Sequence, residues 1–248
     1  MIELIQIFLL YIIFSVTLFV PVNVFGHSLK KYKVDSLQIS TINLIINLNL
    51  LLFISLLNYS IDIYQGYLVA FYLIIFLITY HKSLSNFYKN YFQYRYVFII
   101  FLILAINVAS ELKLGWDAQF FYYIKSLYFF EGKTILNLND FVSNEYHPHF
   151  GSYLWGFFRN LSMNDIEYTG RLFYVYIFCI SIFYLTSKEK NNYLNIVIYL
   201  IIIIATYQYK YFSGLQDILL FSILVIISKY IHNYTVSKEK IYLFLILL

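Results

Sequence analysis

The chain has 248 residues, of which 61% are hydrophobic, 22% aromatic and 12% charged. A soluble domain carries about 25% charged residues, so this composition excludes an ordinary water-soluble protein and indicates an integral membrane protein. The net charge of +4 comes from Lys and Arg residues scattered over short segments, which argues against a surface that binds nucleic acid.

Long runs without charged residues predict membrane-spanning helices along the whole chain. The N-terminal run carries Glu3 in place of a basic region and is too long for a signal peptide, so we expect a retained span. The runs lack the alternation of strands and approach the about 20 residues that a helix needs to cross a bilayer. Seven spans are predicted, near 4–25, 38–58, 63–81, 96–112, 167–187, 192–209 and 213–231.

The last residues, KIYLFLILL, begin an eighth span. A span needs about 20 residues, so the sequence predicts an N-terminal fragment of a longer protein, or an incomplete reading frame.

The connections between these spans alternate in charge. One set of connections holds 11 basic and 3 acidic residues, whereas the rest of the chain holds 6 basic and 10 acidic residues. This basic set is 27–37, 82–95, 188–191 and 229–240. The positive-inside rule places it in the cytoplasm, and therefore places the N-terminus and the long loop 113–166 outside.

The apolar run 149–158 within the long loop is short for a span, and a span there would invert everything that follows. We therefore expect a juxtamembrane helix that lies in the membrane interface. The predicted fold is an all-α, polytopic transmembrane bundle. Its N-terminal helices occupy 1–95, and its core, truncated at the C-terminus, occupies 96–248.

Asp117 stands between a long apolar run and a stretch with apolar residues at helical spacing. Asp is a favoured N-cap and Gly132 suits the position after a helix end, so Asp117 is predicted to cap a helix. Trp116 beside it is predicted to be an interfacial anchor. A cap faces the polar layer where a substrate headgroup would arrive, so Asp117 is also a candidate catalytic group.

His147 and His149 flank Pro148, a residue that suits the first turn of a helix. Two histidines are a weak metal signal, because zinc sites usually have three or four ligands. They are either solvated interfacial side chains or donors to a phosphate, together with Arg159.

Asp217 falls about one turn into an apolar run, where a carboxylate is costly and indicates a functional site. Ser213 and Gly214 before it leave N-capping as the alternative. Glu167 and Arg171 have the i,i+4 spacing of an ion pair on a helix.

Three segments together resemble the GT-C superfamily of polytopic glycosyltransferases, in particular bacterial relatives of the dolichyl-phosphate-mannose-type protein mannosyltransferases. They are GWDAQFFYYIKSLYFFEG (115–132), YHPHFGSYLWGFF (146–158) and YFSGLQD (211–217). By position, Asp117 matches the catalytic acid of the first outer loop, 147–150 its second motif, and Asp217 the later acid. The chain departs from the family in having three spans before the usual first one and no second proline in HPHFGS.

The resemblance implies transfer of a sugar from a polyprenyl-phosphate carrier to a glycan, lipid or protein acceptor, with inversion, on the outer side of the cell membrane. Asp117 would be the general base for the acceptor hydroxyl. Asp217 would orient the acceptor or share a divalent cation, Mg²⁺ or Mn²⁺, with Asp117; no other cofactor is expected. The substrate-binding residues would be Trp116, His147, His149, Arg159 and Lys210.

Two other classes of function stay open. A polymerase or ligase of surface polysaccharide would also have a long outer loop, but would rely on Arg and His more than on paired Asp. In a transporter or a structural membrane protein, Asp117 would be only a cap.

Overall fold

The computed structural model describes residues 2–19, 36–136, 148–162, 165–187, 192–209 and 212–247, and gives only the backbone of 79–93 and of a few other residues near helix ends. Within these ranges the chain is helical and has no strand, as predicted. The helices are α1 (Ile2–Phe14), η1 (Ser15–Phe19), α3 (Ser36–Leu56), α4 (Ile61–Ser110), η2 (Ala118–Tyr122), α5 (Tyr123–Phe130), α6 (Phe150–Asn160), α7 (Tyr168–Thr186), α8 (Asn192–Tyr209), α9 (Asp217–Ser237) and α10 (Lys240–Leu247).

Five helical segments of the described chain are long and apolar enough to cross a membrane. They are Ile2–Phe19, Leu37–Leu56, Ile61–Ile78, Tyr168–Thr186 and Asp217–Ser237. Two shorter apolar helices, Tyr94–Ser110 and Tyr193–Thr206, coincide with the remaining predicted spans. These helices support an integral membrane protein, whereas the total of seven spans stays a prediction.

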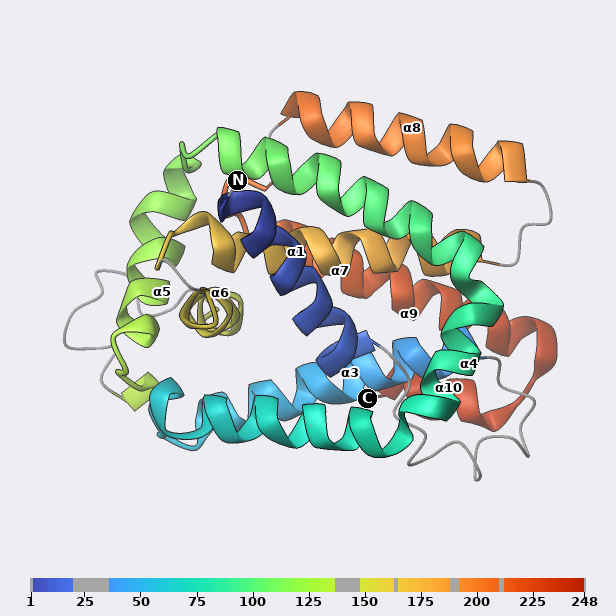
Figure 1. The fold of residues 1–248 in the computed structure, drawn as a ribbon, viewed down its shortest axis with the longest axis horizontal. Coiled ribbons are helices and arrows are strands. Elements are labelled where there is room, and N and C mark those ends of the chain that lie inside the picture. The colour runs from blue at the N-terminus through green and yellow to red at the C-terminus, as the bar shows by residue number, and fades with distance from the viewer. Residues whose placement is uncertain are drawn as a thin grey trace.

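Helix α4 joins two of the predicted spans through the predicted connection 82–95. It has 50 residues and would be about 75 Å long if it were straight. Figure 1 shows instead two arms, teal and green, that meet at a sharp bend. The chain stays helical through this polar connection because it contains no Gly or Pro between Gly66 and Gly115.

The helix ends gather at two opposite ends of the bundle. The bend of α4, the end of α7, the start of α8 and the turn from α9 to α10 lie at one end, on the right of Figure 1. Helices α5 and α6 lie at the other end, on the left. The helices that flank three of the four basic connections thus end at the same end of the bundle, and the side of the membrane on which this end lies stays a prediction.

Helix α7 occupies the centre of the bundle, and 94% of its membrane-spanning stretch is buried. It packs against α1, α4, α6 and α9. Its rings interlock with those of its neighbours: Phe173 stacks on Phe158 at 4.1 Å between ring centroids, and Phe14 meets Phe158 edge to face at 5.0 Å. Many aromatic residues therefore fill the core of the bundle.

Helix α3 is joined to its neighbours by buried hydrogen bonds between side chains. The Tyr230 hydroxyl donates to Thr41 Oγ1 at 3.0 Å, and Gln38 Nε2 donates to the Tyr242 hydroxyl at 2.8 Å. Such bonds between helices stabilise a bundle in lipid, where apolar contact alone gives little preference for protein over acyl chains.

Candidate functional site

Two loops meet at the end of the bundle that carries α5 and α6. The Gly115 amide donates to Ser213 O at 2.9 Å, which joins the loop before Asp117 to the loop before Asp217. Gly214 has a φ of +97°, and a Cβ there would stand 2.6 Å from Trp155 Cη2 and 3.0 Å from Ala118 Cβ. The backbone therefore packs directly on the Trp155 ring, and this close approach brings the two acidic segments together.

Both acidic side chains are exposed at this end, and neither is the cap that the sequence suggests. Asp117 has helical dihedral angles (φ −62°, ψ −36°) and makes no side-chain capping hydrogen bond, so the capping prediction is wrong. Asp217 is the first residue of α9, at the mouth of the span instead of one turn inside it, because 213–216 form a turn. Its carboxylate faces the positive end of the helix dipole.

Tyr122 connects the two acids electrostatically. Its pKa is raised, first by burial of the hydroxyl and then by the charges of Asp217 and Asp117. It belongs to the π-helical turn η2, a local irregularity that often accompanies functional sites. No sequence pattern points to Tyr122, because only the meeting of the two loops brings Asp217 near it.

The predicted ion pair of Glu167 and Arg171 is confirmed. Arg171 Nε and Nη2 donate to the two carboxylate oxygens of Glu167 at 2.7 and 2.8 Å, and Nη1 donates to Phe212 O at 3.0 Å. Burial raises the pKa of Glu167, and the charge of Arg171 opposes that shift. The pair thus joins the start of α7 to the loop that leads to Asp217.

His149 precedes α6, and its carbonyl accepts the Tyr153 amide at 2.8 Å. Its Nε2 is buried and makes no hydrogen bond to any residue that the structure describes. Burial and the nearby Lys125 lower the pKa of His149. Lys125 is itself fully buried, and burial lowers its pKa. His149 can therefore offer a neutral N–H or a lone pair at neutral pH.

The other predicted substrate-binding residues are distributed unevenly. Trp116 is 68% exposed and packs on Phe120 at 5.1 Å between ring centroids, and its role as an interfacial anchor stays a prediction. Arg159 lies 10 residues beyond His149, about 15 Å along α6, where its Nε and Nη2 donate to Asp165 O at 3.1 and 2.9 Å. His147 and Lys210 lie outside the described residues.

Arg159 also lies over the Phe130 ring, with its guanidinium carbon 4.3 Å from the ring centroid. Phe130 is 13 residues beyond Asp117 on the η2–α5 helix, about 20 Å along its axis. Arg159 is therefore placed beside the far end of α5 and away from the start of η2.

A divalent cation shared by Asp117 and Asp217, as predicted, would have these two carboxylates as its protein ligands. The described ranges contain no group of three or more His, Cys, Asp or Glu side chains able to hold a metal. Protein ligands from Asp117 and Asp217 alone would leave most positions of a Mg²⁺ ion to water and substrate oxygens, an arrangement common for this ion. The cation stays a prediction.

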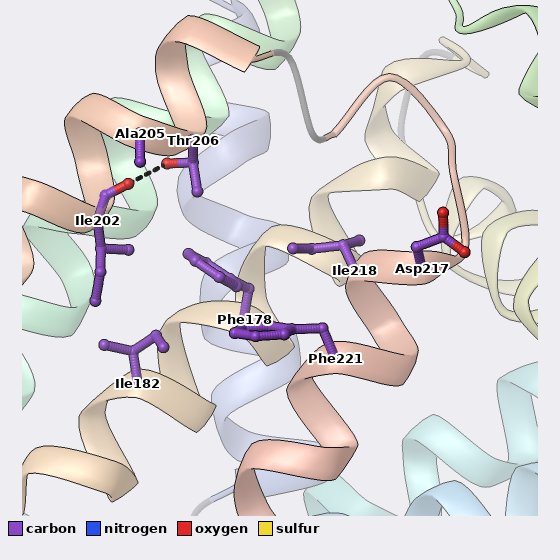
Figure 2. Close-up of a pocket in the computed structure, with 8 residues that line it drawn as sticks. All are labelled: Phe178, Ile182, Ile202, Ala205, Thr206, Asp217, Ile218 and Phe221. Atoms are coloured by element: carbon purple, nitrogen blue, oxygen red, sulfur yellow. Dashed lines mark hydrogen bonds between the residues drawn. The ribbon is translucent and has the colours of Figure 1, made fainter.

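A cavity of about 410 Å³ lies between α7, α8 and α9. Its lining is apolar except for Asp217 and for Thr206, whose hydroxyl donates to Ile202 O of its own helix at 2.7 Å. Figure 2 shows Asp217 at one end of the cavity, Phe178 and Phe221 in the middle, and Ile182 and Ile202 at the other end. The cavity therefore offers an apolar surface with Asp217 at its edge, the carboxylate turned away from the other lining side chains.

No protein-family model, curated protein or solved structure matches this chain. The resemblance to the GT-C glycosyltransferases therefore depends on the three short segments, and the activity that it implies is a proposal.

Proposed function

We propose that the protein is a membrane glycosyltransferase that takes a sugar from a polyprenyl-phosphate carrier. One observation carries the proposal: Asp217 borders the apolar cavity of about 410 Å³, in the loop that the Gly115–Ser213 hydrogen bond joins to the loop before Asp117. A lipid-linked sugar needs an apolar groove and polar catalytic groups side by side, because its two halves differ in polarity.

The cavity suits the isoprenoid part of such a carrier. The rings of Phe178 and Phe221 and the branched chain of Ile182 provide apolar contact, and the carrier phosphate and sugar would then lie toward Asp217. Lipid tails are as apolar as the cavity wall, so shape and packing in the cavity would favour the isoprenoid over an acyl chain.

The chemistry assigned to the acids is inverting transfer. An acceptor hydroxyl attacks the anomeric carbon, the bond from that carbon to the phosphate oxygen breaks, and its electron pair leaves with the phosphate. Asp117 accepts the proton of the hydroxyl, and Asp217 orients the acceptor or shares a Mg²⁺ or Mn²⁺ ion with Asp117. The exposed Trp116 ring would stack on the sugar. The N–H of His149 would donate a hydrogen bond to the departing phosphate.

Arg159, His147 and Lys210 complete the proposed binding groups. Arg159 lies at the far end of α5, about 20 Å along the helix axis from Asp117, so it could contact only a part of the substrate distant from the general base. The proposed topology has seven spans, with the acidic end outside the cell membrane and the basic connections in the cytoplasm. It places the acceptor, whether glycan, lipid or protein, in the extracytoplasmic space.

The test is Asp117→Asn in membranes supplied with a labelled polyprenyl-phosphate sugar. We expect transfer to fall by about 10²–10⁴-fold, the contribution of a general base. The amount of folded protein should stay unchanged, because Asp117 makes no capping bond.

Asp62→Asn is the matched control, since Asp62 lies near the same end and accepts a hydrogen bond from Asn160 at 2.8 Å. Full transfer by Asp117→Asn would refute the assignment of the base. A ladder of long products would favour the polymerase, and a parent protein without any transfer would favour a transporter or structural role.

A further inference from the structure

The buried pair of Glu167 and Arg171 reaches beyond helix α7. The Arg171 side chain is 1% exposed and that of Glu167 is 17% exposed. Besides holding the carboxylate with two donors, Arg171 donates a third bond to Phe212 O at 3.0 Å. A planar guanidinium can hold a carboxylate on one edge and a carbonyl on another at the same time, which a Lys ammonium at the same site cannot reproduce.

Stability alone is a weak reason for such a pair. Desolvation offsets much of the attraction between two buried charges, and apolar replacements of similar volume are often neutral or stabilising. The pair has a second consequence here, because it fixes the backbone carbonyl of Phe212 five residues before Asp217.

Four contacts hold the 212–217 loop, at Phe212, Ser213, Gly214 and Gln216. Each contact lies within a few residues of Asp117 or Asp217 along the chain. The contacts are Arg171 Nη1 to Phe212 O at 3.0 Å, Gly115 N to Ser213 O at 2.9 Å, Gly214 on the Trp155 ring, and Gln216 Nε2 to Ser152 Oγ at 2.9 Å. Gly115 stands two residues before Asp117, and Gln216 stands directly before Asp217.

We infer that Arg171, oriented by Glu167, is a positioning residue that sets the separation of Asp117 and Asp217. It acts through the Phe212 carbonyl, which places Ser213 against Gly115. The catalytic meaning of this separation rests on the proposed function, whereas the separation itself follows from the contacts alone. A misplacement of about 1 Å can reduce turnover by about 10²-fold, so positioning of this kind has a measurable effect.

The first experiment measures the geometry without any activity. Spin labels at Asp117→Cys and Asp217→Cys, two exposed positions, report their separation by dipolar EPR in a Cys179→Ala background, since Cys179 is the only cysteine. We expect Arg171→Met to broaden and lengthen the distance distribution, and Arg171→Lys to do so partly. Arg171→Lys keeps the positive charge beside Glu167 and remains informative if Arg171→Met does not fold.

Lys229→Met is the matched control. Lys229 donates to Leu185 O at 3.0 Å, a cation-to-carbonyl bond between α9 and α7 at the opposite end of the bundle. Its removal should leave the distance distribution of the parent protein unchanged. If folded Arg171→Met and Arg171→Lys give the same distance distribution between the labels as the parent protein, the inference is overturned. The ion pair would then stabilise only the start of α7.

The second experiment measures transfer of the labelled sugar. For Arg171→Met we expect kcat to fall about 10²-fold with KM changed less than about threefold, and we expect Arg171→Lys to recover part of kcat. A raised KM with an unchanged kcat would overturn the positioning role. Absence of transfer in the parent protein would refute the proposed function, and the EPR comparison would still decide the positioning inference.

Discussion

Substitution of Gly214 by Ala tests whether the loop before Asp217 packs on Trp155 as described. The φ of +97° disfavours any residue with a Cβ, and a backbone of this kind costs about 1–3 kcal/mol. The new Cβ would stand 2.6 Å from Trp155 Cη2 and 2.9 Å from Cζ3, and overpacking of this kind costs about 1–3 kcal/mol more. We therefore expect Gly214→Ala to lower the free energy of unfolding by about 2–6 kcal/mol.

The measurement is reversible unfolding by SDS in mixed micelles, followed by tryptophan fluorescence. The chain has two Trp residues, of which Trp155 is buried and Trp116 is exposed, so the loss of the buried environment reports on this site. Gly66→Ala is the matched control, because a Cβ at Gly66 meets nothing within 4 Å and Ala is the better helix former by about 1 kcal/mol. A loss below about 1 kcal/mol in Gly214→Ala would refute the packing of the loop on Trp155.

Three further predictions use the same unfolding measurement. Arg171→Met should cost about 3–5 kcal/mol because it leaves Glu167 charged and buried, and Glu167→Leu in the same chain should restore most of the loss; no recovery would contradict an ion pair. The pKa of His149 is lowered on folding, so the unfolded chain binds more protons than the folded chain as the pH drops below 6.5. The free energy of unfolding should therefore decrease below pH 6.5, and this decrease should be smaller in His149→Gln. Thr41→Val should cost about 0.6–1.7 kcal/mol by removing the acceptor of Tyr230, and a double-mutant cycle with Tyr230→Phe that shows no coupling would contradict the bond.

The sequence predicts the helices well because the bilayer leaves few alternatives. Long apolar runs must satisfy their backbone groups internally, so they can form only helices or closed barrels, and the alternation of charge then predicts which helix ends meet. Local signals also succeed: Gly132 has a φ of +78° and ends α5, with Lys133 N bonded to Tyr128 O at 3.1 Å, as expected of a residue after a helix end.

The errors and omissions concern contacts between distant segments. The residues around Asp117 are typical of a helix N-cap. In the structure, the Gly115–Ser213 hydrogen bond holds the preceding loop, and the exposed Asp117 side chain makes no capping hydrogen bond. Lys125 looks like a polar residue on an amphipathic helix, and the packing of α5 on α6 buries it completely. Periodicity describes the faces of one helix and carries no information about what another segment places against them.

Helix α7 has no lipid-facing side. Most membrane helices tolerate changes on the face that touches acyl chains, which gives substitution data a period near 3.6 residues. With 94% of its span buried, α7 has no such tolerant face, whereas α9 has 33% of its span buried. A deep mutational scan is therefore expected to find most substitutions over 168–186 damaging, without periodicity. Over 217–237 it should find tolerant and sensitive positions alternating with a period near 3.6 residues.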